Sequence, residues 1–291
     1  MLYVWAAPPI FALGPLAVLL ALSRPASSRE RAWLLATVLL SLVWLAPVGG
    51  VADQVTRAAG VFLTAAFAAV SLLRLGGFPA RAGLAVAAAA AATAVTCAAV
   101  GIGWGVVRRD VGRMALRFYR TLEETNAGGA PSERTAAMLD AMYALVDATA
   151  SLFPGMLALW ALAGLALAWS WHRRLASRPH GGPLGTLRDF RFSDHLVWGF
   201  VIALGLLLAG APEPWRTGAA NLLLVLGTLY AVRGAAVGAA SFPRLPLPVV
   251  LGGMIGVILL LPLVVFGLLL LGLVDTWVDF RRHLPASRSG D

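Results

Sequence analysis

Residues 245–274 read LPLPVVLGGMIGVILLLPLVVFGLLLLGLV, a stretch of thirty consecutive positions without a charged side chain. A helix needs about 20 apolar residues to cross the roughly 30 Å of hydrocarbon in a bilayer. The stretch is therefore long enough to span a membrane. Its excess length predicts a tilted helix or a break near Pro262.

Seven further apolar runs precede this stretch. They lie at residues 2–22, 33–51, 58–73, 82–107, 148–171, 196–212 and 217–242. Of the 291 residues, 59% are hydrophobic and 13% are charged, whereas about 25% of an ordinary soluble domain is charged. The composition predicts an all-α, polytopic transmembrane bundle of about eight spans. The first run contains Pro8, Pro9 and Pro15 and lacks a basic start, so we expect a retained, kinked span and not a cleaved signal peptide.

One polar insert interrupts the apolar runs and divides the chain. We expect an N-terminal four-span half at residues 1–107, an extramembrane helical hairpin at 108–147, a C-terminal four-span half at 148–284 and a polar tail at 285–291. In the insert, arginines recur every three or four residues and acids every seven, which places each set on one helical face. The two sets are Arg109, Arg113, Arg117 and Arg120, and Glu133, Asp140 and Asp147.

These two stripes predict helices at residues 109–125 and 133–147, packed antiparallel across the turn at Gly128 and Gly129. In the alternative interpretation, both stripes face solvent, with the basic one lying on phosphate headgroups. The hairpin is also a candidate surface for a protein partner. The antiparallel register predicts two contacts, Arg117 near Asp140, and Arg113 or Arg109 near Asp147.

The formal net charge is +9, and all 23 basic residues are arginines. They lie at the ends of apolar runs and in short loops, where they meet lipid headgroups, so we expect membrane lipid and no nucleic acid as a partner. With eight consecutive spans, eleven arginines fall on each side of the membrane and Arg233 lies within a span. The positive-inside rule therefore leaves the orientation open.

No motif in the chain predicts an enzyme. The four histidines lack the short spacing of a metal site, and the glycines between Gly101 and Gly105 lack the preceding strand of a nucleotide-binding loop. Ser193, Asp194 and His195 are adjacent and would point in different directions, so we expect Ser193 or Asp194 to cap the sixth span. We expect no catalytic residue, no metal and no cofactor.

Arg233 is the most informative single residue. It lies about eight residues, or roughly 12 Å, from the end of its run, which is further than an arginine comfortably snorkels. We expect it to point into the bundle and to bond a polar group of another span. Asn221 shares its side of the helix. Asp275 and Asp279 share one face at the end of the last run, where the helix dipole disfavours acids, so we expect an arginine of another segment to hold them. Arg188 or Arg191 can be that arginine only if the chain re-enters the same side of the membrane.

The second half of the chain carries a familiar pattern. Its elements are Arg188-Asp-Phe-Arg-Phe-Ser-Asp-His-Leu-Val-Trp198, Asn221, Gly234, Gly272-Leu-Val-Asp275 and Asp279-Phe-Arg281-Arg282, with Pro154 before them. Over residues 153–284 this pattern resembles the YybS-like family of bacterial polytopic membrane proteins. Members usually carry glutamine where this chain has Arg233, and a proline near Ser193. The resemblance implies an eight-span, multi-pass protein of the bacterial cytoplasmic (inner) membrane and implies no particular activity.

Two classes of function follow. Such bundles are loosely similar to the substrate-binding subunits of energy-coupling-factor vitamin transporters, which favours small-molecule binding or transport. In that case Asn221, Arg233, Asp275 and Asp279 contribute to the ligand site. In the alternative, the protein is a non-transporting scaffold, and the same four residues hold the bundle together. A transporter should show a wet pocket that converges on Arg233, and a scaffold should show these groups paired and dry.

Overall fold

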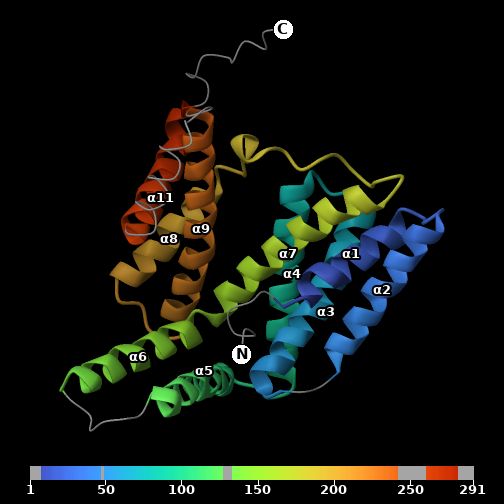
Figure 1. The fold of residues 1–291 in the computed structure, drawn as a ribbon. Helices are drawn as coiled ribbons and strands as arrows, with labels where there is room; N and C mark the ends of the chain where they lie inside the picture. The colour runs from blue at the N-terminus through green and yellow to red at the C-terminus, as the bar shows by residue number, and fades with distance from the viewer. Residues whose placement is uncertain (1–7, 47–48, 127–132, 242–259, 281–291) are drawn as a thin grey trace. The chain divides into compact units, whose positions relative to one another are not determined.

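The structure is a computed structural model that describes residues 8–46, 49–126, 133–241 and 260–280, and at 115, 117–126 and 133–139 it describes the backbone alone. Within these ranges it contains α-helices, one short 3-10 turn and no strand, so the all-α prediction is confirmed for the described part (Figure 1). The chain divides into two compact units, Met1–Leu184 and Gly185–Asp291. We describe each unit by itself.

The first unit contains seven helices. They are α1 (Ile10–Leu22), α2 (Ser28–Leu45), α3 (Val51–Leu72), α4 (Phe78–Ala99), α5 (Trp104–Asn126), α6 (Glu133–Ser151) and α7 (Phe153–Leu175). α1 packs on α2, α3 and α7, and α4 packs on α3 and α7. Their shared core holds Phe11, Leu63, Phe67, Leu165 and Trp169. The sequence division at residue 148 assigned α7 to the C-terminal half, but its packing against α1 places it with the first unit.

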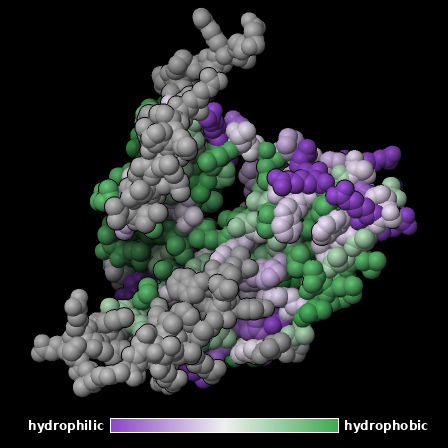
Figure 2. Space-filling view, in the orientation of Figure 1, coloured by the Kyte–Doolittle hydropathy of each residue, from purple (hydrophilic) through white to green (hydrophobic). Residues whose placement is uncertain are grey.

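Each of the eight predicted runs overlaps a described helix, with α8 (Leu196–Leu208), α9 (Trp215–Ser241) and α11 (Leu261–Val278) completing the set. Five of these helices, α3, α4, α7, α9 and α11, are long and apolar enough to cross a membrane. Large hydrophobic side chains remain exposed along them and along α2, where Val43 is 72% exposed. Figure 2 shows such side chains over broad areas of the surface, as lipid contact requires.

α3 begins seven residues earlier than the predicted run, which opened at Ala58. The added turns carry Asp53 and Arg57, which form an ion pair of 2.7 Å between Arg57 Nε and Asp53 Oδ2. Arg57 also donates to the main-chain oxygen of Trp44. These two bonds hold the Arg57 side chain within the bundle. A charged residue is tolerated in a helix when it is paired with a residue one turn away.

The polar insert forms the predicted helical hairpin. α5 and α6 pack together antiparallel, since Arg108 bonds Asp147 while Gly112 lies beside Val146. The register differs from the prediction, however. Asp147 pairs with Arg108 at 2.7 Å and not with Arg113 or Arg109, and Arg113 instead bonds Asp110 of its own helix at 3.3 Å. The predicted pair of Arg117 with Asp140 lies outside the described side chains.

The second unit is built around Tyr230 of α9. Its helices α8, α9 and α11 follow a short 3-10 turn, η2 (Leu187–Asp189). The Tyr230 ring is fully buried and meets the rings of Phe192 and Phe200 edge-on, with centroids 5.0 and 5.9 Å apart. Such aromatic contacts stabilise a core beyond their buried area alone.

α9 and α11 run parallel. Residue numbers rise together along their contact, because Gly227 faces Leu269, Tyr230 faces Gly272 and Arg233 bonds Asp275. Two consecutive spans joined by a short loop would run antiparallel. The alternating direction assumed for the seventh and eighth runs is therefore wrong. The apolar run at 245–274 suggested one span that directly follows the seventh run. In the structure, however, Ser241 and Leu260 lie at opposite ends of the helix pair.

The two backbones touch where α9 and α11 cross. A Cβ atom added to Gly234 would lie 1.9 Å from the main-chain oxygen of Leu268, and one added to Gly272 would lie 1.9 Å from that of Tyr230. Only glycine fits at both positions. Small residues at such crossings are the usual means of close helix packing in membranes. Gly238, one turn after Gly234, has nothing within 4 Å of an added Cβ, so it takes no part in this close contact.

Candidate functional site

Arg233 lies within the second unit, one position before the glycine at the crossing, and points toward α11. It is 4% exposed, and Asp275 of α11 is fully buried. Arg233 Nε donates to Asp275 Oδ2 at 2.8 Å, and Nη2 donates to the main-chain oxygen of Asp275 at 3.1 Å. The prediction that Arg233 bonds a polar group of another span is therefore confirmed. The spacing Gly272-x-x-Asp275 puts the crossing point and the ion pair one turn apart on the same face.

Two groups from the segment before α8 complete the surroundings of Arg233. Asp194 Oδ1 accepts from Arg233 Nη1 at 2.7 Å, and the guanidinium carbon lies 5.5 Å from the centroid of the Phe192 ring. We call Arg233, Asp275, Asp194 and Phe192 the Arg233 cluster. Its core is paired and dry, which is the arrangement expected when charged groups hold helices together.

Asp194 was missed as a partner of Arg233. The sequence suggested that Ser193 or Asp194 caps the sixth span, but α8 has His195 at its N-cap and no side-chain cap bond. The usable signal was topological, because α8 and α9 are antiparallel neighbours and the start of one lies beside the end of the other. A carboxylate just before α8 therefore lies level with an arginine late in α9.

The four residues predicted for a ligand site are only partly brought together. Asp279, whose side chain is 24% exposed, bonds Arg191 at 2.6 Å, which confirms the expected arginine from another segment. Asn221 lies twelve residues before Arg233, or about 18 Å along the helix, and donates to the main-chain oxygen of Thr217 at 2.8 Å. Asn221 is thus not part of the Arg233 cluster.

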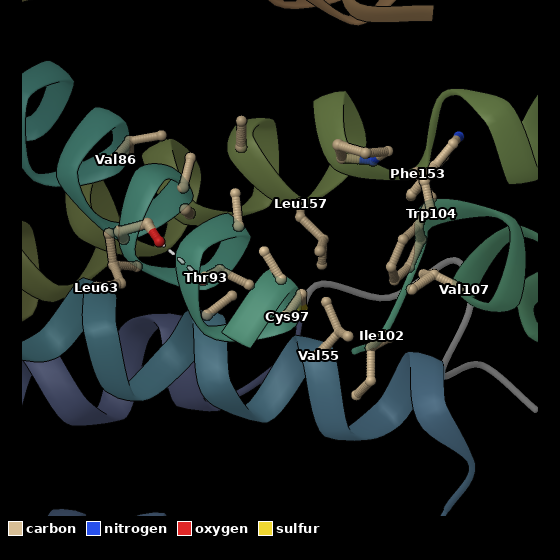
Figure 3. A pocket seen from close by; sticks show the side chains of 18 of the residues that line it. Val55, Leu63, Val86, Thr93, Cys97, Ile102, Trp104, Val107, Phe153 and Leu157 are labelled. Carbon is tan, nitrogen blue, oxygen red and sulfur yellow. Dashed lines mark hydrogen bonds between the residues drawn. The ribbon is translucent and has the colours of Figure 1, made fainter. Parts of the chain in front are cut away.

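An apolar cavity lies in the first unit. It measures about 590 Å³, between α3, α4, α7 and the start of α5. In Figure 3, Val55 of α3, Thr93 and Cys97 of α4, and Leu157 of α7 surround one space. The Thr93 hydroxyl donates to the oxygen of Ala89 in its own helix at 2.7 Å, so it adds no free donor to the wall.

Trp104 closes one end of this cavity at the first residue of α5. Its Nε1 is buried, and no described group accepts its hydrogen. A cavity of this size with apolar walls and one polar position has the usual character of a small-molecule site. Sequence patterns did not indicate it, because its lining comes from five helices and consists largely of alanines, valines and leucines.

A buried acid fixes one end of the first unit. Glu30, at the start of α2, accepts from the main-chain nitrogen and the hydroxyl of Ser177, which follows α7, and from the nitrogens of Ala26 and Ser27. The hydrogen bonds from Ser177, the largest influence, lower the pKa of Glu30 to about 2 from its ordinary 4.5. Glu30 therefore joins the start of α2 to the end of α7 and makes no opening for a ligand.

Comparison with known proteins gives one match. Neither the curated proteins nor the solved structures contain a match to this chain. The profile of one family, described as predicted membrane protein (DUF2232), matches residues 6–276. This match also includes the first four apolar runs, which lie before the region that resembles YybS-like proteins. With nearly the whole sequence matched, and with helices long and apolar enough to cross a bilayer, the chain belongs to the DUF2232 family of membrane proteins.

Proposed function

We propose that this protein binds a small apolar molecule in the cavity of its first unit, as a non-enzymatic binding or transport protein of the bacterial inner membrane. The observation that carries the proposal is the cavity of about 590 Å³ walled by α3, α4, α7 and the start of α5. Ligand cavities commonly measure 300–1,000 Å³ and hold few polar groups. The loose similarity of such bundles to the substrate-binding subunits of energy-coupling-factor transporters favours the same class of function.

Cys97 offers a direct test, because it is the only cysteine of the chain and lines this cavity. A bound molecule should slow the reaction of Cys97 with a thiol reagent such as N-ethylmaleimide. The experiment screens apolar compounds against the full chain in mild detergent and measures the labelling rate by mass spectrometry. A compound that fills the cavity should protect Cys97 in the native protein and not after denaturation.

Two substitutions on α4 make the assay specific. Ala94 lines the cavity, so Ala94→Phe should abolish protection by the ligand. Ala88 is exposed on the same helix and is not among the residues that line this cavity, so Ala88→Phe should leave protection intact. Protection that survives Ala94→Phe would refute binding in this cavity.

The parallel arrangement of α9 and α11 also supports an orientation in the membrane. The equal count of eleven arginines on each side of the membrane assumed that the last two spans end on opposite sides of it. Because α9 and α11 are parallel, the arginines that follow α11, namely Arg281, Arg282 and Arg288, join the other side and change the count to fourteen against eight. By the positive-inside rule, the side with fourteen faces the cytoplasm.

This orientation puts the C-terminal tail inside and the α5–α6 hairpin outside. The eight apolar helices are then all in the membrane. A membrane-impermeant thiol reagent applied to intact cells should label Gly128→Cys in the hairpin turn and not Ser287→Cys in the tail, both in a Cys97→Ser background. The reverse labelling pattern would refute the orientation.

The scaffold alternative is favoured by one observation, the buried ion pair of Arg233 and Asp275. These two residues bond each other across α9 and α11, so we assign them, with Asp194 and Asp279, to holding the second unit together. This assignment replaces the expected ligand site on α9 and α11. As a scaffold, the protein would act by binding a protein partner through the α5–α6 hairpin. A Cys97 labelling rate that no apolar compound changes would favour that role.

A further inference from the structure

A second cavity of the first unit combines apolar walls with buried charge. It measures about 530 Å³ and lies between the end of α2, the start of α3, α5 and α7. Asp53 and Arg57 line it, with side chains only 15% and 11% exposed. Trp44 and Trp160 line it as well. It is separate in character from the cavity around Cys97, where no charged side chain contributes to the wall.

Two donors at this cavity have spare capacity. Trp44 is 9% exposed, and its buried Nε1 meets no acceptor among the described residues. Arg57 uses Nε for Asp53 and Nη1 for the oxygen of Trp44, which leaves further N–H groups of a guanidinium with five donors. The guanidinium also lies 4.7 Å from the centroid of the Trp44 ring. A buried donor without an acceptor is unfavourable, so this corner favours a ligand oxygen.

The charge at this corner favours a neutral oxygen over an acid. Asp53 already compensates Arg57 at 2.7 Å. Asp110, which accepts from the main-chain nitrogen of Ala52 at 3.0 Å, is compensated in turn by Arg113 at 3.3 Å. A ligand carboxylate would therefore find no unpaired cation in a poorly solvated space and would lose its hydration. A carbonyl oxygen satisfies the donors without that loss.

The outer wall of the cavity is apolar and exposed, as contact with acyl chains requires. Leu40 and Val43 of α2 line it and are 53% and 72% exposed. These residues lie in the last two turns of α2, beside Trp44, and tryptophan prefers the boundary between hydrocarbon and headgroups. The ester carbonyls of glycerolipids occupy the same depth, and their acyl chains match apolar walls.

We propose that this second cavity is a specific site for an ester-linked glycerolipid, with a lipid ester carbonyl accepting from Trp44 Nε1 and Arg57. The acyl chain lies along the apolar wall formed by Leu40, Val43 and Trp160. The site is independent of the apolar-ligand cavity around Cys97, so either proposal can fail without the other.

The test compares two lipids that differ only at the carbonyl. The full chain in mild detergent is mixed with equal amounts of diester and diether phosphatidylcholine of the same chain length, and native mass spectrometry measures the ratio bound. The diester should be preferred about twofold to tenfold, the range expected for one hydrogen bond. Trp44→Phe keeps the ring and removes the donor, so its ratio should fall to one. Trp160→Phe makes the same change elsewhere in the same wall and should keep the preference.

Each remaining outcome overturns the proposal. Equal retention of the two lipids by the native protein shows that no carbonyl is bound, and this comparison needs no variant to fold. A preference that persists in Trp44→Phe shows that the carbonyl binds elsewhere. Stronger retention of a free fatty acid than of the diester assigns the corner to an acid and removes the argument from charge.

Discussion

Removing Arg233 should destabilise the second unit through Asp275 far more than through Asp194. Leucine at position 233 leaves a fully buried carboxylate without its cation, and breaking such a pair costs about 3–5 kcal/mol. The Asp194 side chain is 63% exposed, so solvent screens its bond to Arg233 and Asp194→Ala should cost about 0.2–1 kcal/mol. Asp275→Leu should therefore cost several times as much as Asp194→Ala.

A double-substitution cycle separates this explanation from general damage. Arg233→Leu with Asp275→Leu replaces a buried ion pair by apolar groups, which is often neutral in free energy, so the double variant should be more stable than either single one. Arg233→Gln should fold and lose less than Arg233→Leu, because its amide still donates to the remaining acceptors.

The assay is reversible unfolding of the full chain in mixed detergent micelles, followed by circular dichroism. Equal losses for Asp194→Ala and Asp275→Leu, or additive losses in the double variant, would refute the reasoning. Protection of Cys97 by an apolar ligand should be unchanged in Arg233→Leu, since the Arg233 cluster belongs to the second unit and the Cys97 cavity to the first. Loss of that protection in a folded variant would instead return Arg233 to a functional role.

Three further outcomes follow from the same structure. Gly272→Ala should unfold or separate α9 and α11 because its Cβ meets a backbone oxygen at 1.9 Å, whereas Gly238→Ala, with open space, should be neutral or stabilising by up to about 1 kcal/mol in the same assay. The folded-state pKa of Glu30 is lowered, so its contribution to stability is complete above pH 4.5 and is lost as the pH falls toward 2. The melting temperature of Glu30→Gln should lack this pH dependence. Melting temperatures that fall with acid in the same way in Glu30→Gln and in the native protein would contradict the prediction. Arg108→Ala should cost the hairpin only about 0.2–1 kcal/mol, because Asp147 is 65% exposed, and hydrogen exchange of α6 amides should show no larger change.

Much of the fold was determined by local sequence. Runs of about 20 apolar residues must become helices in a bilayer, since lipid cannot satisfy free backbone groups, and each predicted run overlaps a described helix. The spacing of acids and arginines predicted the hairpin in the same way. The depth of Arg233 in its run required a partner from another span, and Asp275 is that partner.

Tertiary structure decided what the linear pattern left open. The parallel course of α9 and α11 depends on a backbone contact between Gly234 and Gly272, which an apolar run does not encode because every register of leucines looks alike. The pairing of Asp194 with Arg233 requires α8 and α9 to be neighbours, a property of three-dimensional packing. The two cavities are formed by side chains from several helices, none of them unusual for a membrane span. Hydrophobicity along the chain placed the helices in the membrane, but the choice of neighbours depended on close contacts that only the folded chain creates.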